Sequence, residues 1–97
     1  MIQVIQTDIF EKWLDRIRSA KTQAVISDHI DRMREGNLGD TRSVGGSIFE
    51  KRIHYAGGYR LYYYFVLSER IILLCGGDKR TQQQDIARAK KLKEKYC

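Results

Sequence analysis

Hydrophobic positions recur with a helical period in the first part of the chain. Residues 1–6 alternate apolar and polar side chains, which predicts a short β-strand. Apolar residues then recur at helical spacing from Phe10 to about Arg18, and again over Thr22–Glu35. Gly36 follows the second run at the position where glycine commonly ends a helix. We therefore expect a strand followed by two helices that form a hairpin with one apolar face.

After these helices the pattern changes to strands separated by turn-forming residues. The expected strands are a short one at Asp40–Val44, followed by Ser47–Tyr55, Tyr59–Leu67 and Arg70–Gly76. The last of these is nearly all apolar, which predicts an inner strand covered on both faces. A helical pattern returns over residues 81–96.

The resulting order of elements, β-α-α-β-β-β-β-α, predicts an α+β fold. Consecutive strands with short turns form an antiparallel-rich, twisted sheet, accompanied by a helical hairpin and a C-terminal helix. The length of 97 residues suits a single domain over residues 1–97. We expect the helices to cover one face of the sheet and to leave the other face free to bind a ligand.

The composition favours a cytoplasmic protein without a membrane segment. No apolar run approaches the roughly 20 residues that a membrane-spanning helix needs. The two cysteines form neither a disulfide framework nor a zinc motif, which favours a reducing compartment. We expect Cys75 to be a small buried hydrophobe, Trp13 to pack in the core, and His29 to be a core or rim residue of the second helix.

The net charge of +6 is unevenly distributed along the chain. Residues 1–35 hold six basic and six acidic residues and are neutral. Residues 36–67 hold four basic and two acidic residues, and residues 68–97 hold eight and four, which gives +2 and +4. An excess of cations favours a polyanionic partner such as a nucleic acid. The alternative is a solvated basic surface that only aids solubility.

The strands before and after Ala56–Gly58 predict a mixed basic and aromatic surface. A hairpin closed by these three residues pairs His54 with Arg60 and Arg52 with Tyr62. One face of the hairpin then gathers six side chains, which are Glu50, Arg52, His54, Arg60, Tyr62 and Tyr64. Cations interleaved with tyrosines suit phosphate binding and base stacking. The alternative is a solvated sheet face on which Glu50 pairs with an arginine.

A second basic feature lies where the apolar strand gives way to the last helix. The turn Gly76-Gly77-Asp78-Lys79-Arg80 allows close backbone approach, and the start of the following helix favours anions. Its spacing is not that of a phosphate-binding P-loop. Basic residues of the last helix, including Arg88 and Lys91, form either an extension of this basic path or a solvated face.

Short motifs distributed over nearly the whole chain match those of a known protein family. The matching motifs are Gly36-Asn37-Leu38-Gly39-Asp40, Val44-Gly45, Glu50-Lys51-Arg52-Ile53, Gly58-Tyr59-Arg60-Leu61-Tyr62-Tyr63 and Leu74-Cys75-Gly76-Gly77-Asp78-Lys79, with Gln83 and Asp85-Ile86. In combination they resemble the addiction-module killer proteins, which are HigB-like toxins of the RelE/ParE superfamily. Lys51 departs from the leucine that is usual in the family, and it indicates an edge or a contact with an antitoxin.

This resemblance implies the toxin of a type II toxin–antitoxin system. RelE-like members cleave mRNA in the ribosomal A site, whereas ParE-like members share the fold and inhibit DNA gyrase. The resemblance favours a ribosome-dependent mRNA endonuclease that needs no metal and no cofactor. Its implied partners are the ribosome, mRNA and a HigA-like helix-turn-helix antitoxin. A gyrase inhibitor and a non-catalytic nucleic-acid-binding module remain the alternatives.

The resemblance also implies which residues act. The catalytic candidates are Arg52, His54, Arg60 and Lys79. The candidates for RNA binding are Tyr62, Tyr64, Arg80, Arg88 and Lys91. Superfamily members often carry a tyrosine or histidine near the C-terminal helix as acid or base, but residues 82–86 contain neither. His54 is therefore the best titratable candidate for proton transfer.

Overall fold

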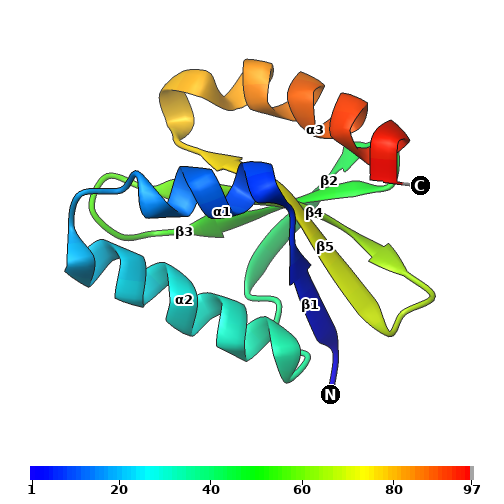
Figure 1. Ribbon diagram of the computed structural model, residues 1–97, viewed down its shortest axis with the longest axis horizontal. Coiled ribbons are helices and arrows are strands. Elements are labelled where there is room, and N and C mark those ends of the chain that lie inside the picture. Colours follow the sequence, from blue (N-terminus) through cyan, green and yellow to red (C-terminus); the bar gives the residue numbers. More distant parts are fainter. Residues whose placement is uncertain (97) are drawn as a thin grey trace.

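The protein is built around a five-stranded sheet, seen in the computed structural model in Figure 1. Residues 1–96 are described, and Cys97 lies outside them. The elements are β1 (Gln3–Gln6), α1 (Asp8–Asp15), α2 (Ala20–Arg34), β2 (Asp40–Gly45), β3 (Ile48–Ile53), β4 (Tyr59–Val66), β5 (Arg70–Gly77), the 3₁₀ turn η1 (Lys79–Thr81) and α3 (Gln82–Tyr96). The predicted α+β class and element order are confirmed.

The strand order is β1-β5-β4-β3-β2. The four consecutive strands β2 to β5 form the predicted antiparallel meander. β1 pairs in parallel with β5, which places β5 inside the sheet as its apolar sequence predicts. None of the helices within residues 1–96 is both long enough and apolar enough to span a membrane.

Side-chain caps set where the first two helices begin. The hydroxyl of Thr7 accepts a hydrogen bond from Phe10 N at 3.1 Å and donates one to Leu74 O at 2.8 Å, so it ties the start of α1 to β5. The hydroxyl of Ser19 accepts from Thr22 N at 3.1 Å. Because Ser19 is the cap, α2 begins two residues earlier than the apolar pattern predicts.

The sheet is covered on both faces, so the expectation of a free face is wrong. α1 and α2 pack on one face, whose buried core is Phe10, Ile26, Ile30, Met33, Ile53, Leu61, Tyr63, Ile71 and Leu73. α3 packs on the opposite face (Figure 1), over Ile48, Tyr62, Tyr64, Ile72, Leu74 and Cys75, with its own Ala89 inward. The predicted burial of Cys75 and packing of Trp13 are confirmed.

The hairpin of β3 and β4 has a different register from the one predicted. Arg52 pairs with Arg60, and Glu50 pairs with Tyr62, so every pair is displaced by two residues. The turn is longer than three residues because pairing stops at Ile53 and resumes at Tyr59. Within this turn, residues 56–58 all have positive φ angles, from 49° to 98°. A displacement by two leaves each side chain on its predicted face.

Gly76 allows α1 to pack closely on β5, and this contact gives a test of the core. A Cβ atom at Gly76 would lie 2.4 Å from the Trp13 ring. We expect Gly76→Ala to lower the free energy of unfolding by about 1–3 kcal/mol through overpacking, as measured by urea denaturation. In a Trp13→Leu background the same change should cost less, because the ring is gone. Equal costs in the two backgrounds would contradict this account of the contact.

Candidate functional site

A row of polar residues crosses four strands at one end of the sheet. Asp40 of β2 lies opposite Arg52 of β3, Arg52 lies opposite Arg60 of β4, and Arg60 lies opposite Gly77 of β5. Directly paired residues share a face, so the three side chains project on the side that α3 covers elsewhere. The side chain of Arg52 remains 40% exposed and that of Arg60 14%. We call Asp40, Arg52 and Arg60 the arginine row.

One step further into the sheet, Glu50 forms a buried ion-pair cluster. Its carboxylate accepts hydrogen bonds from Arg42 Nε at 2.9 Å, Gln82 Nε2 at 2.9 Å and Tyr62 OH at 3.0 Å. Arg60 Nε lies 3.5 Å from the same carboxylate, an ionic contact without a hydrogen bond. Burial by itself would raise the pKa of Glu50, but the hydrogen bonds outweigh it and bring the pKa below its ordinary value. The interpretation that Glu50 pairs with an arginine is therefore confirmed.

Asp40 holds two of the predicted catalytic side chains. Its carboxylate lies 2.7 Å from His54 Nε2 and 3.0 Å from Arg52 Nη2. Both hydrogen bonds lower the pKa of Asp40, and the one from His54 has the larger effect. An ionised carboxylate only accepts, so Nε2 of His54 carries a proton and Nδ1 faces away from Asp40. The predicted pairing of His54 with Arg60 is wrong, because His54 follows the end of β3 and its side chain is 73% exposed.

The arginine row has unused hydrogen-bond donors. Within residues 1–96, the Nε atoms of Arg52 and Arg60 are buried and have no hydrogen-bond partner. A buried donor without a partner costs about 1–3 kcal/mol. Two like charges directly opposite each other on neighbouring strands are also destabilising. A bound anion would relieve the repulsion between the two cations, since arginine binds phosphate through paired N–H groups.

The turn after β5 brings two further cations to this end of the sheet. Asp78 accepts from Arg80 N at 2.8 Å and pairs with Arg80 Nη2 at 3.0 Å, which fixes η1. Lys79 is exposed and makes no ion pair within residues 1–96. The turn borders a hollow of about 320 Å³ whose lining is Ala56, Gly57, Gly58, Tyr59, Asp78, Lys79 and Arg80. We call this the hairpin hollow.

Gly77 is required where α3 meets the arginine row. A Cβ atom at Gly77 would lie 1.9 Å from Asp85 Oδ2, so only glycine leaves room for that carboxyl group. Asp85 also accepts a hydrogen bond from the Thr81 hydroxyl at 2.6 Å. Burial raises the pKa of Asp85. These contacts hold the start of α3 against β5 and keep the turn carrying Lys79 in place.

The predicted stacking of RNA bases on Tyr62 and Tyr64 is wrong. Tyr62 is fully buried beneath α3, and burial raises the pKa of its hydroxyl group. Tyr64 is 4% exposed, and its hydroxyl donates to Tyr96 O at 3.2 Å. Neither ring presents a face to a base. The predicted RNA-binding residues Arg88 and Lys91 are exposed on α3.

Lys51 is buried rather than placed at an exposed edge. Its residue exposure is 1%, and its Nζ donates to Leu38 O at 2.8 Å. Burial lowers the pKa of Lys51. The expected contact of Lys51 with an antitoxin is therefore wrong.

His29 is half-buried, as predicted. Its burial lowers its pKa, and the positive charge of Lys51 lowers the pKa further.

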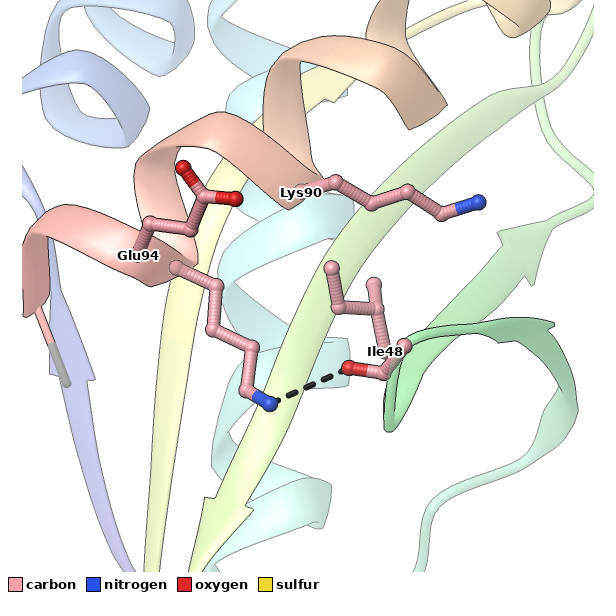
Figure 2. Close-up of a pocket in the computed structure, with 5 residues that line it drawn as sticks. Ile48, Lys90 and Glu94 are labelled. Carbon is pink, nitrogen blue, oxygen red and sulfur yellow. Dashed lines mark hydrogen bonds between the residues drawn. The ribbon is translucent and has the colours of Figure 1, made fainter.

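A separate hollow of about 370 Å³ lies between α3 and the turn before β3. Figure 2 shows residues that line it. Ile48 faces it from the start of β3, and Lys90 and Glu94 face it from α3. Lys93 Nζ donates to Gly46 O at 3.1 Å across it. Ile48 is four residues from Arg52, or about 13 Å along the strand. This hollow is therefore distinct from the arginine row.

Sequence reasoning missed Asp40 and Arg42 as members of the site. The alternating charges along β2 and β3, which pair in the sheet, are the signal that could have identified them. Asp40 and Arg42 face Arg52 and Glu50 with opposite charge at each pair. Within residues 1–96, no cluster of three His, Cys, Asp or Glu side chains is arranged to hold a metal ion.

The fold is that of the RelE toxins. A mutant of the RelE toxin of E. coli, in its free state, superposes with a TM-score of 0.67 over 90% of this chain and 96% of that one. The toxin–antitoxin complex RelBE of E. coli gives 0.66, over 80% and 96%. A copper-bound mutant toxin from Helicobacter pylori gives 0.61, over 82% and 97%. The sequence identities are 10%, 10% and 19%, so these matches establish the fold alone.

The sequence itself identifies the family. Residues 12–95 match the family described as phage derived protein Gp49-like (DUF891), and the chain belongs to it. Over 91 residues, it is 44% identical to a protein of Haemophilus influenzae that is described as an uncharacterized protein. That match spans 94% of this chain and 92% of the relative.

The buried carboxylate of Glu50 predicts a pH-dependent loss of stability. Because its pKa is lower in the folded chain than in the unfolded one, it stabilises the fold above about pH 4.3, and this contribution is lost as the pH falls through the folded-state pKa. We expect Glu50→Gln to lower the free energy of unfolding by about 2–3 kcal/mol at pH 7. The difference from the parent protein should shrink below about pH 4 in urea denaturation. The exposed Glu69→Gln variant is the control, and a similar loss there would contradict the assignment.

Proposed function

We propose that this protein is the toxin of a type II toxin–antitoxin system and that it cleaves mRNA on the ribosome. The arginine row is the observation that carries the proposal, because it holds two guanidinium groups opposite each other on neighbouring strands, an arrangement that suits a phosphate. The RelE fold supports it. The RelBE structure of E. coli is a complex of a toxin with its antitoxin. An antitoxin of the helix-turn-helix, HigA-like type is the partner we propose here.

The proposed reaction is an attack of the ribose 2′-OH on the adjacent phosphate, with no metal and no cofactor. The bond from phosphorus to the 5′ oxygen breaks, which leaves a 2′,3′-cyclic phosphate and a 5′-OH. The phosphorane formed on the way carries two negative charges. Arg52 and Arg60 stay charged at all relevant pH values and stabilise these charges from fixed positions. Lys79, on the neighbouring turn, supplies a further cation.

Proton transfer in this reaction is assigned to His54. One proton leaves the 2′-OH and one reaches the departing 5′ oxygen. Asp40 accepts from Nε2 of His54, so Nδ1 is the atom that exchanges a proton with the RNA. Asp40 also pairs with Arg52 and so places the proton carrier beside the phosphate-binding cation. The ribosome then holds the 2′-OH in line with the phosphate, which a small protein surface does not do by itself.

Expression in bacteria tests the proposal directly. We expect the chain to arrest growth when it is expressed alone and to be neutralised when an adjacent antitoxin gene is co-expressed. Primer extension should show new transcript ends within codons at the ribosomal A site. Normal growth at high expression would contradict the toxin assignment. Intact transcripts together with stabilised gyrase–DNA complexes would instead identify a ParE-like gyrase inhibitor.

Arg60 gives a residue-level test of phosphate binding. We expect Arg60→Ala to lower the cleavage rate by roughly 10²–10³, the loss seen when one stabilising group is removed from a transition state. Arg60→Lys should recover part of this rate, because it keeps the charge but not the paired N–H groups. Glu50 keeps its bonds from Arg42, Gln82 and Tyr62, so the variant should fold, as circular dichroism would show. Arg18→Ala, on an exposed residue outside the site, is the matched control.

His54 and Lys79 are tested by single-turnover cleavage of mRNA in purified ribosomes. Both residues are exposed, so their replacement by alanine should leave the stability within about 0.5 kcal/mol of the parent. We expect His54→Ala to slow cleavage and to flatten its dependence on pH, because the proton carrier is lost. Lys79→Ala should slow cleavage with the pH dependence retained. Parental rates in both variants would remove them from the proposed mechanism.

A further inference from the structure

A second basic cleft lies between α1 and α3, which run side by side in Figure 1. Its volume is about 300 Å³, and its lining residues are Ile9, Lys12, Trp13, Arg16 and Arg88. Three of these five residues are cations and none of them is acidic. We call this the helix cleft.

The three cations of the helix cleft come from two separate helices. Lys12 and Arg16 are four residues apart, so they lie on one side of the C-terminal end of α1, where the helix dipole favours positive charge. Arg88 reaches the same cleft from α3. None of the three makes an ion pair within residues 1–96. Arg88 interacts electrostatically with Asp85, whose carboxyl group is hydrogen bonded to Thr81.

The helix cleft adjoins the hairpin hollow through two aromatic residues. The ring of Trp13 lines the cleft and lies 6.2 Å, centre to centre, from the ring of Tyr59 in an edge contact. Tyr59 in turn lines the hairpin hollow together with Lys79 and Arg80. The helix cleft and the hairpin hollow, both of which are lined by cations, therefore adjoin each other.

We propose that the helix cleft is a second RNA-binding site, which holds the phosphate backbone of the strand beyond the reacting phosphate. These converging cations make no ion pair, and phosphate groups neutralise such cations with release of counterions. The proposal rests on the proposed function for the choice of RNA as the polyanion. RNA is favoured over an acidic protein segment because the cleft adjoins the hairpin hollow, whose lining includes Lys79, a residue of the proposed mRNA site.

Binding of an uncleavable RNA tests this site apart from catalysis. The probe is a short, fluorescein-labelled oligonucleotide with 2′-O-methyl riboses, which lacks the attacking hydroxyl group. The variant carries Lys12→Gln, Arg16→Gln and Arg88→Gln. The matched control carries Arg18→Gln, Lys21→Gln and Lys95→Gln, three exposed cations outside the cleft. Both variants lose the same net charge, so any difference between them reports the position of the cations.

We expect the cleft variant to bind the probe more weakly than the control in fluorescence anisotropy titrations. The slope of log K against log salt concentration should fall by about 2, since each phosphate contact with a single strand contributes about 0.7. Trp13 is the only tryptophan of the chain, and its fluorescence should change when the probe binds to the parent protein. Equal losses in the two variants, or no probe binding by the parent protein, would overturn the proposal. Stronger binding of polyglutamate than of the probe at equal salt would also overturn it.

These outcomes separate the helix cleft from the proposed endonuclease activity. If the cleft variant loses probe binding while the parent protein cleaves no mRNA, the RNA site stands and the endonuclease assignment fails. If the cleft variant binds the probe like the control while the parent protein cleaves mRNA, the endonuclease assignment stands and the RNA site fails.

Discussion

The buried carboxylate of Glu50 is the interaction on which the arrangement of the site depends. A buried charge is stable only when partners surround it, and its partners come from β2, β4 and α3. Gln82 is the first residue of α3, so its bond to Glu50 fixes where that helix starts over the sheet. The next row of side chains, Arg52 and Arg60, therefore lies beyond the start of the helix and stays accessible.

The order of elements could be predicted from the sequence because each strand and helix carries its own hydrophobic period. The register of the β3–β4 hairpin could not. Alternation of apolar residues determines which face a side chain takes, but a shift by two residues keeps that face. The turn determines which register forms. In this turn Ala56 adopts a positive φ, which is uncommon for alanine and so could not be predicted from the sequence. In the observed register, His54 lies off the sheet and Arg52 lies opposite Arg60.

The cations of the candidate site could be predicted from the sequence, but the residues around them could not. Arg52, Arg60 and Lys79 lie at one end of the sheet because strand alternation and the turn after β5 place them there. Tyr62 looked exposed because its neighbours on that face are charged. Its hydroxyl group instead bonds to Glu50, which allows the whole ring to be buried. Asp40 was missed because its role depends on the pairing of β2 with β3, a contact between strands rather than a local pattern.

The acidic residues divide the cations of the protein into two groups with different physical properties. Asp40, Glu50 and Asp78 each hold an arginine at the end of the sheet. Such held cations lose little freedom when an anion binds, and this is the property that stabilises charge developing in a reaction. Lys12, Arg16 and Arg88 make no ion pair within residues 1–96, so they gain more when a polyanion neutralises them. Preorganised cations favour one specific phosphate geometry, whereas unpaired cations bind the backbone of a nucleic-acid strand irrespective of its sequence. The ring contact of Trp13 with Tyr59 joins the cleft that holds the second group to the hollow lined by Lys79 and Arg80.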